Sequence, residues 1–183
     1  AMILVQMPLR MEATGELRAQ VRRGVFATEA GTVRQIPVGH ASPVKAGEVI
    51  AVLENPELQV QLQQSREELV AATETLKIKE VERDQRKDTS ELRKIQLDGE
   101  IAELHERIDY QKSRIALLEQ RIANLALTAP IDGVVATWDP RRQLLDRPIV
   151  AGNLLLTVIK ADGPWRLELR LPEIDAGPVL AAW

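Results

Sequence analysis

Cysteine is absent from the 183-residue chain, which excludes disulfide bonds, thiolate zinc sites and thiol catalysis together. Aromatic residues make up only 3% of the sequence. Charged residues, Leu, Ala and Gln are abundant instead, a balance that favours a large helical or coiled-coil fraction over a pocket-rich enzyme core. The net charge of −3 gives no sign of nucleic-acid binding. No apolar run approaches the roughly 20 residues that span a bilayer.

The residue types that carry out catalysis or bind metals are few and scattered. The two histidines, His40 and His105, have no spaced carboxylate partners, so they predict neither a metal site nor a catalytic pair. Ser65 and Ser113 lack a neighbouring His/Asp arrangement, and the G-x-x-x-x-G-K-S/T phosphate-binding loop is absent. We therefore predict a protein that is not an enzyme, with no catalytic, cofactor-binding or metal-binding residues.

Proline and glycine are scarce in the middle of the chain. Between Glu57 and Ala126 there is no proline and a single glycine, Gly99, although the whole chain has ten of each. Both residue types interrupt regular elements. This partition predicts helices in the middle and strands with turns on both sides.

Apolar residues of the middle segment recur at alternating spacings of three and four, as in the heptad seam of a coiled coil. In its second half the seam comprises Ile101, Leu104, Ile108, Gln111, Ile115, Leu118, Ile122 and Leu125. In its first half it comprises Leu58, Leu62, Ser65, Leu69, Ala72 and Leu76. After these residues we predict a shift of phase to Ile78 and Val81.

A wholly polar stretch, residues 83–91, separates the two seams and predicts two antiparallel helices with a turn near residue 88. Facing residues in such a hairpin have a constant index sum, and the seam pairs sum to 176 or 177. This register places Ser65 opposite Gln111 and Val81 opposite Ile95.

The segments that flank the helices contain an internal repeat. Residues 43–50 (PVKAGEVI) match residues 148–155 (PIVAGNLL), and Gly31–Val33 matches Gly133–Val135, with offsets of 105 and 102 residues. Each half reads strand, turn, Ala-Gly turn and apolar strand, and neither half can bury its apolar face alone. We predict that the two halves form one sandwich about a pseudo-twofold axis, with the coiled coil inserted between them.

Alternating apolar and charged residues at 17–22 and 165–172 are typical of half-buried strands. We expect these two strands either to pair with each other or to begin a further β domain.

The order of these parts resembles that of the HlyD-like membrane fusion proteins, also called periplasmic adaptor proteins. The resemblance covers roughly residues 25–175 and is carried by EAGTVRQIPVGHASPVKAGEVIAVLENPEL, a heptad hairpin, LALTAPIDGVVATW and VAGNLLLTVI. The Ala-Pro-x-x-Gly motif at Ala129–Gly133 is a particularly good match. The resemblance implies an α+β fold, in which a lipoyl-like barrel-sandwich is split by a long antiparallel α-helical coiled-coil hairpin, with partial β-barrel strands at both ends.

The implied domain division places N-terminal strands of a partial β-barrel at 1–24 and the two halves of the lipoyl-like domain at 25–56 and 127–160. The helical hairpin occupies 57–126, and a β-barrel domain starts at 161–183. The resemblance further implies a non-catalytic adaptor subunit of a transmembrane efflux or secretion system. Such a subunit bridges an inner-membrane transporter to outer-envelope components and forms a homo-oligomeric ring. Its expected location is the periplasm or cell envelope, with an inner-membrane anchor outside this chain.

The polar tip of the hairpin holds the candidate partner contacts, and the alternative is an ordinary solvated turn. These candidates are Arg83, Arg86, Lys87, Asp88 and Arg93. Adaptors that dock on an outer-membrane duct often carry Arg, then Leu four residues later, then Ser seven residues after that. Arg93 and Leu97 match the first two positions, whereas Leu104 stands at the Ser position and departs from the pattern.

Two other functions remain open: an envelope coiled-coil structural protein without a transporter, and a biotinyl or lipoyl carrier domain. The stretch PVKAGEVIAVLENP at 43–56 resembles the approach to a modifiable lysine. However, Lys45 precedes the glycine turn, and helical sequence follows Asn55 and Pro56. We interpret this stretch as one half of a split platform whose apex has become the arm.

Overall fold

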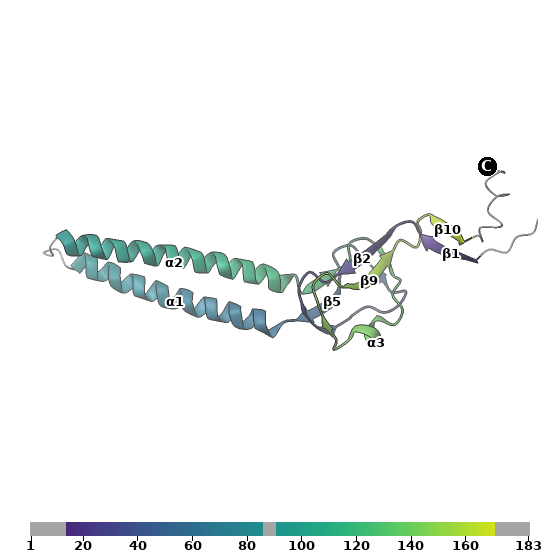
Figure 1. Ribbon diagram of the computed structural model, residues 1–183, viewed down its shortest axis with the longest axis horizontal. Helices are drawn as coiled ribbons and strands as arrows, with labels where there is room; N and C mark the ends of the chain where they lie inside the picture. Colours follow the sequence, from purple (N-terminus) through teal and green to yellow (C-terminus); the bar gives the residue numbers. More distant parts are fainter. Residues whose placement is uncertain (1–13, 86–90, 171–183) are drawn as a thin grey trace, which may run out of the picture.

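The computed structural model describes residues 14–85 and 91–170. This part of the molecule is elongated, with a helical hairpin at one end, two β-sheets in the centre and a two-stranded ribbon at the other end (Figure 1). The hairpin consists of α1 (Pro56–Gln85) and α2 (Glu91–Ala123), as predicted. At 1.5 Å per residue the helices are about 45 and 50 Å long. The turn expected near residue 88 lies outside the described residues.

The transition from strand to helix occurs at Asn55 and Pro56. Strand β5 (Val49–Glu54) ends directly before them. The Asn55 carboxamide oxygen accepts a hydrogen bond from the Leu58 backbone N–H at 3.2 Å, and the Asn55 amide group donates to the Ala30 carbonyl at 2.8 Å. Asn is a preferred N-cap residue, and Pro at the first helical position has a backbone already suited to the helix. The predicted exit of the chain from the sheet into the arm is therefore confirmed.

The two helices pack along the predicted heptad seam over most of their length. Their buried residues are Leu58, Ser65 and Ala72 on α1 and Leu97, Ile101, Ile108, Gln111 and Leu118 on α2. The polar members Ser65 and Gln111 are only 1% and 4% exposed. The Gln111 amide donates to a Glu68 carboxylate oxygen at 2.5 Å. Polar residues buried in a coiled-coil seam restrict the register in which the helices can pack.

The predicted phase shift near the tip is wrong. Ile78 and Val81 are 67% and 52% exposed, and Ile95, the expected partner of Val81, is 68% exposed. Leu97, in contrast, is 1% exposed. The seam therefore continues in its original phase, which places Lys79 at the next seam position of α1. The aliphatic stem of a lysine can cover apolar surface while its ammonium group stays in solvent, so this position does not require an apolar residue.

Two four-stranded antiparallel sheets form the centre of the molecule, with strand orders β2-β9-β7-β4 and β6-β5-β3-β8. The strands before the hairpin are β2 (Arg22–Phe26), β3 (Gly31–Gln35), β4 (Pro43–Val44) and β5. Those after it are β6 (Ala126–Thr128), β7 (Gly133–Val135), β8 (Pro148–Ile149) and β9 (Leu154–Ile159). A short helix, α3 (Pro140–Leu144), joins β7 to β8.

The internal repeat is visible in this topology. Exchanging β2 with β6, β3 with β7, β4 with β8 and β5 with β9 converts the strand order of one sheet into that of the other. The Ala-Gly turns are equivalent as well, because Gly47 and Gly152 have φ angles of 83° and 89°. Gly47 donates its backbone N–H to the Ala129 carbonyl, and Gly152 donates its N–H to the Ala27 carbonyl, at 2.9 and 2.7 Å. The apolar faces of both halves contribute to one core cluster.

The ribbon consists of β1 (Thr14–Ala19) and β10 (Trp165–Arg170), which pair antiparallel, so the first of the two expectations for these strands is confirmed. Leu17 lies opposite Leu167, and Arg18 lies opposite Arg166. Because neighbouring residues of a strand point to opposite faces, the ribbon has one apolar face and one charged face.

The unshifted seam leads to a prediction for the tip half of the hairpin. Leu97→Ala leaves a cavity between the helices and should cost about 2–5 kcal/mol of local stability, measured as lost amide protection by hydrogen exchange. Ile95→Ala should leave protection nearly unchanged, because Ile95 is exposed. A larger loss of protection in Ile95→Ala than in Leu97→Ala would show that the seam shifts phase near the tip after all.

A second prediction concerns Gly133, which the backbone of β9 approaches closely. A Cβ atom at Gly133 would lie 2.2 Å from the Ile159 carbonyl oxygen, whereas a Cβ at Gly99 has nothing within 4 Å. Gly133→Ala should therefore destabilise the fold by about 1–3 kcal/mol in denaturant titrations. Gly99→Ala, in the interior of α2, should stabilise it by up to about 1 kcal/mol. Equal effects of the two substitutions would contradict this packing.

Candidate partner-contact surfaces

The base of the hairpin is bound to the sheets by an ion pair with two hydrogen bonds. Arg121 of α2 donates from Nε and Nη2 to the two carboxylate oxygens of Glu29, at 2.9 and 2.7 Å. Glu29 lies between β2 and β3, and its side chain is 16% exposed. The hydrogen bonds from Arg121 lower the pKa of Glu29, and the same contact raises the pKa of Arg121. Bidentate Arg–carboxylate pairs of this kind restrain orientation as well as distance.

Apolar contacts hold the same junction. Leu58 of α1 and Leu118 of α2 belong to the core cluster of the two sheets, together with Leu125 just after α2. Leu62 and Ile122 pack against this cluster from the next helical turns. The first turns of the arm are therefore packed into the same apolar core as the two sheets.

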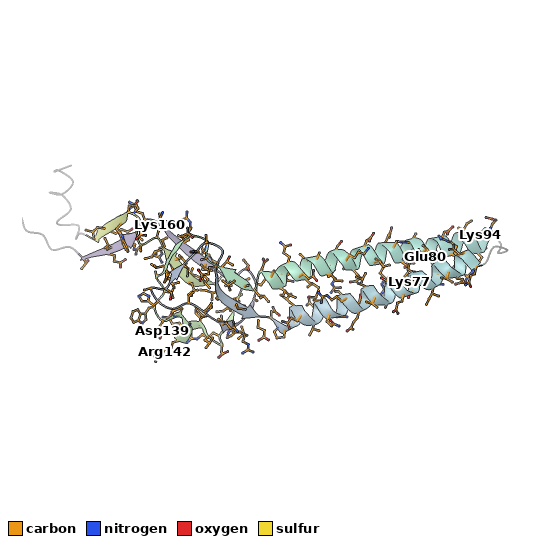
Figure 2. All side chains as sticks on the ribbon, turned by 180° about the vertical axis from the view of Figure 1, so that it is seen from behind. Lys77, Glu80, Lys94, Asp139, Arg142 and Lys160 are labelled. Carbon is orange, nitrogen blue, oxygen red and sulfur yellow. The ribbon has the colours of Figure 1, made fainter. Side chains whose placement is uncertain are left out.

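The described part of the tip carries charged residues that are largely paired within the hairpin. Arg93 of α2 lies 3.6 Å from a Glu82 carboxylate oxygen of α1, and Lys79 lies 2.6 Å from Glu100. Arg83 lies 3.4 Å from its neighbour Asp84. Arg86, Lys87 and Asp88, the other predicted contacts, lie outside the described residues. Figure 2 shows further charged side chains, including Lys77, Glu80 and Lys94, on this half of the hairpin.

Four exposed apolar side chains near the tip were missed by sequence reasoning. We call them the apolar tip residues: Ile78, Val81, Leu92 and Ile95, which are between 52% and 71% exposed. Three of them, Ile78, Val81 and Ile95, had been assigned to the seam. The signal that could have placed them outside is Leu97, which continues the α2 seam from Ile101 at a spacing of four. Ile78 and Val81 lie on α1, and Leu92 and Ile95 lie on α2, so each helix exposes two apolar side chains to solvent near the tip.

The residues of the partial match to duct-docking adaptors are divided between the seam and the surface of the hairpin. Leu97 is buried between the helices, and Arg93 is engaged with Glu82 across the hairpin. Leu104, at the position expected for Ser, is half-buried in the seam. Leu97 therefore serves the packing of the hairpin itself, whereas Arg93 pairs with Glu82 and remains 40% exposed to solvent.

Lys45 lies in the turn between β4 and β5, before Gly47. Its backbone N–H donates to the Glu48 side chain at 2.9 Å, and its carbonyl accepts from the Glu48 N–H at 3.0 Å. The Lys45 residue is exposed, but it is not at the end of β5, where the approach to a carrier lysine would place one. Asn55 occupies that position.

The histidines and serines that were considered for catalysis lie apart from one another. His40 packs against Trp138 in a tilted arrangement with ring centroids 4.8 Å apart, and His105 contacts the Ile101 carbonyl from within α2. Ser113 donates to the Asp109 carbonyl on the surface of the hairpin. Within residues 14–85 and 91–170, no group of three or more His, Cys, Asp or Glu side chains could hold a metal ion.

Solved structures share this arrangement. MacA from Actinobacillus actinomycetemcomitans superposes with a TM-score of 0.67 at 17% identity over 90% of this chain and 56% of its own. A membrane fusion protein from Streptococcus pneumoniae gives 0.65 at 12% identity over 85% of this chain and 66% of its own. ZneB from Cupriavidus metallidurans gives 0.58 at 17% identity over 80% of this chain and 64% of its own. The fold is therefore that of the membrane fusion proteins, also called periplasmic adaptor proteins.

Other comparisons set the extent of this similarity. No family model and no curated protein sequence matches the chain. The chain spans about half to two thirds of the length of MacA, of the Streptococcus pneumoniae protein and of a putative efflux transporter from Bacteroides eggerthii that it also matches. Neither long helix in the described ranges is apolar enough over a sufficient length to cross a membrane.

The ion pair at the base leads to a pH-dependent prediction. Glu29→Gln should lower the melting temperature by about 2 °C at pH 7, a modest value because Arg121 is 41% exposed and partly screened by solvent. Arg121 lowers the pKa of Glu29 in the folded state. The contribution of the carboxylate is therefore present above the ordinary glutamate pKa of about 4.3 and is lost as pH falls through the lowered value.

Thermal unfolding of the wild type and the Glu29→Gln variant between pH 7 and pH 3 tests this prediction. The difference between them should shrink at the acid end. Glu119→Gln is the matched control, because Glu119 pairs with Arg66 on the exposed surface of the hairpin. If Glu29→Gln lowered the melting temperature no more than Glu119→Gln, or if its effect grew toward acid pH, the Glu29–Arg121 pair would not stabilise the base of the hairpin.

Proposed function

We propose that this protein is a non-catalytic adaptor subunit of a transmembrane efflux or secretion system. In this role it bridges an inner-membrane transporter to other components of the cell envelope, and it acts as a homo-oligomer. It resides in the periplasm or cell envelope and is anchored at the inner membrane. The observation that carries the proposal is the insertion of a long helical arm between two repeated half-motifs that build both sheets together, an arrangement similar to that of the solved membrane fusion proteins.

The two ends of the molecule have different roles in this proposal. The sheets, of the lipoyl-like barrel-sandwich type, form the platform and occupy 25–56 and 127–160. The hairpin, 57–126, is the arm, and the segments at 1–24 and 161–183 belong to a β-barrel domain. This division is supported by the shared core, which holds the two half-motifs and the first turns of the arm together.

The tip of the arm is the proposed contact with an envelope partner. Arg83, Arg86, Lys87, Asp88 and Arg93 provide the charged part of this surface, and the apolar tip residues provide the part that can be desolvated. Charged groups steer encounter and select the partner, whereas buried apolar area contributes most of the affinity. The exposure of Val81 and Leu92, at 52% and 71%, supports this division of roles.

A carrier function has less support. The end of β5 is followed by the N-cap Asn55 and by α1, so no tight turn presents a lysine there. Co-expression with a biotin or lipoyl ligase followed by intact-mass measurement should show no added group. An added group would replace the adaptor proposal with the carrier function.

The adaptor role predicts that the full-length protein co-purifies from detergent-solubilised membranes with the transporter encoded beside it. Photocrosslinking from the arm then locates the partner. A crosslinking residue at Val81 should capture an envelope component in cells, whereas the same residue at Leu117, equally exposed but nearer the base, should not.

Two results would contradict this role. Absence of any transporter after purification favours a coiled-coil structural protein of the envelope. Equal capture from positions 81 and 117 removes the tip as a specific contact. Both variants replace exposed side chains, so loss of folding does not explain either result.

A further inference from the structure

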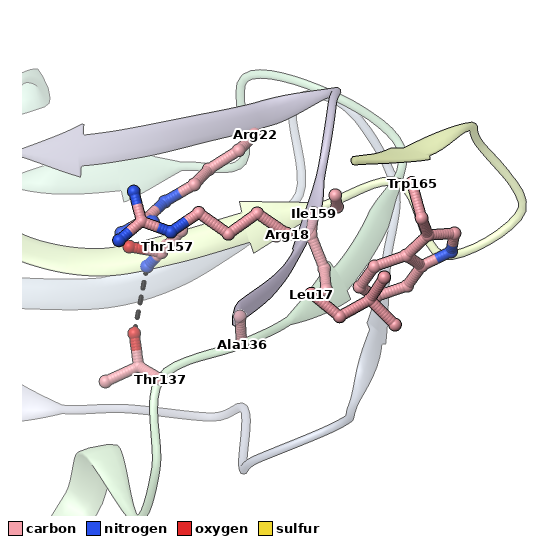
Figure 3. A pocket seen from close by; sticks show the side chains of 9 residues that line it. Leu17, Arg18, Arg22, Ala136, Thr137, Thr157, Ile159 and Trp165 are labelled. Atoms are coloured by element: carbon pink, nitrogen blue, oxygen red, sulfur yellow. Dashed lines mark hydrogen bonds between the residues drawn. The ribbon is translucent and has the colours of Figure 1, made fainter. Parts of the chain in front are cut away.

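A cleft of about 370 Å³ lies where the β1–β10 ribbon meets the sheets, at the opposite end of the molecule from the tip. The ribbon contributes Leu17, Arg18 and Trp165, and the sheet side contributes Arg22, Thr137 and Ile159. Figure 3 shows the cleft from close by. Its volume lies within the range of about 300–1,000 Å³ that small-molecule sites occupy.

The two ends of the cleft differ in chemistry. Leu17 lies against Trp165 at one end, and both are well exposed, at 63% and 44%. The guanidinium groups of Arg18 and Arg22 extend toward the other end, near Thr157 (Figure 3). An apolar wall next to a cationic end matches a ligand that has an aromatic or aliphatic group and a negatively charged head.

The two arginines differ in how they are compensated. Arg18 is paired with Glu16 and Glu168, at 2.6 and 3.3 Å. The Arg22 guanidinium has no hydrogen-bond or ion-pair partner in the part of the chain that the structure describes, and no acidic side chain lines the cleft there. Arg22 therefore has its full set of planar donors available, and that geometry suits a carboxylate, phosphate or sulfonate.

The floor of the cleft supplies one more polar group. The Thr137 hydroxyl oxygen accepts a hydrogen bond from the Thr157 backbone N–H at 2.9 Å (Figure 3). Its own O–H proton is therefore left to donate, since one hydroxyl can donate and accept at once. The Thr157 carbonyl is already bonded to the Ala136 N–H at 2.8 Å.

We propose that this cleft binds a small organic anion, with the acidic head held by Arg22 and the apolar group held between Leu17, Ile159 and Trp165. The cleft would bind such an anion whether or not the protein acts as an adaptor. A free organic anion and an anionic lipid share this chemistry, and the experiment separates the two sources.

The first experiment tests a free anion by NMR titration of the isotope-labelled protein with naphthalene-2-sulfonate. Resonance shifts should concentrate at the amides of Thr137, Thr157 and Ile159 and at the indole N–H of Trp165, which donates to the Ala161 carbonyl at 3.2 Å. The uncharged analogue 2-naphthalenemethanol should bind about tenfold more weakly, because it cannot form charge-assisted hydrogen bonds.

Variants assign the binding to Arg22. Arg22→Gln should weaken naphthalene-2-sulfonate binding about tenfold, whereas Arg22→Lys, which keeps the charge but loses the planar donors, should weaken it by a smaller factor. Arg23→Gln is the matched control, because Arg23 is the next residue of the same strand, does not line the cleft, and donates to the Arg22 carbonyl. The dispersion of the NMR spectrum shows directly that each variant is folded.

The second experiment tests an anionic lipid by co-sedimentation of the same proteins with phosphatidylglycerol vesicles. Arg22-dependent binding of the sulfonate supports a free anion as the ligand, and Arg22-dependent binding to the vesicles alone supports the lipid headgroup. Binding that is unchanged in Arg22→Gln in both experiments, or resonance shifts that lie outside the cleft, would overturn the proposal. Neither result bears on transporter capture, so this inference and the adaptor role can fail separately.

Discussion

One shared apolar core, built by two half-motifs on either side of the helical hairpin, is the interaction on which the rest of the structure depends. Neither half-motif can cover its own apolar face, and each contributes two strands to each sheet, so β2–β5 and β6–β9 are stable only together. The helices enter and leave at this core, and Leu58 and Leu118 are part of it. Closing the sheets therefore also fixes the base of the arm, without a separate interface.

The arm depends on this base for its direction and on its seam for its register. Arg121 and Glu29 restrain α2 against the loop between β2 and β3, while Asn55 caps α1 next to the same loop at Ala30. Along the arm, the hydrogen bond from the buried Gln111 of α2 to Glu68 of α1 favours the register in which the two residues meet. The tip of the arm, about 45 Å away, is thus held in a defined position by short-range packing near the sheets and by helix geometry.

Much of the fold could be predicted from the sequence, because each major element depends on a local pattern. The heptad spacing predicted the hairpin, and the repeated Ala-Gly turns predicted the two half-motifs that build the sheets together. The alternation of apolar and charged residues at both ends predicted the ribbon. The error at Ile78 and Val81 has a physical cause. Burial was assumed to follow apolar character, but Lys79 can occupy the seam position with its charge at the surface beside Glu100.

The candidate surfaces were harder to predict, because they depend on residues that are distant in the sequence. The partners Glu29 and Arg121 are 92 residues apart, and no local pattern joins them. The cleft combines side chains from β1, β2, β9 and β10 with Thr137, so it exists only once the ribbon has paired. The charged tip was visible as a polar run, whereas its apolar neighbours became apparent only after the phase of the seam was known.

The central claim is that the arm is fixed rigidly to the split platform. Its most direct test is a pulsed electron paramagnetic resonance distance between nitroxide labels on cysteines at Val150 and Tyr110. These positions are 65% and 63% exposed, and the chain has no cysteine of its own. We expect one narrow distance distribution that broadens in the Arg121→Gln variant. A broad or bimodal distribution in the otherwise unaltered protein would contradict the claim and show that the arm swings at its base.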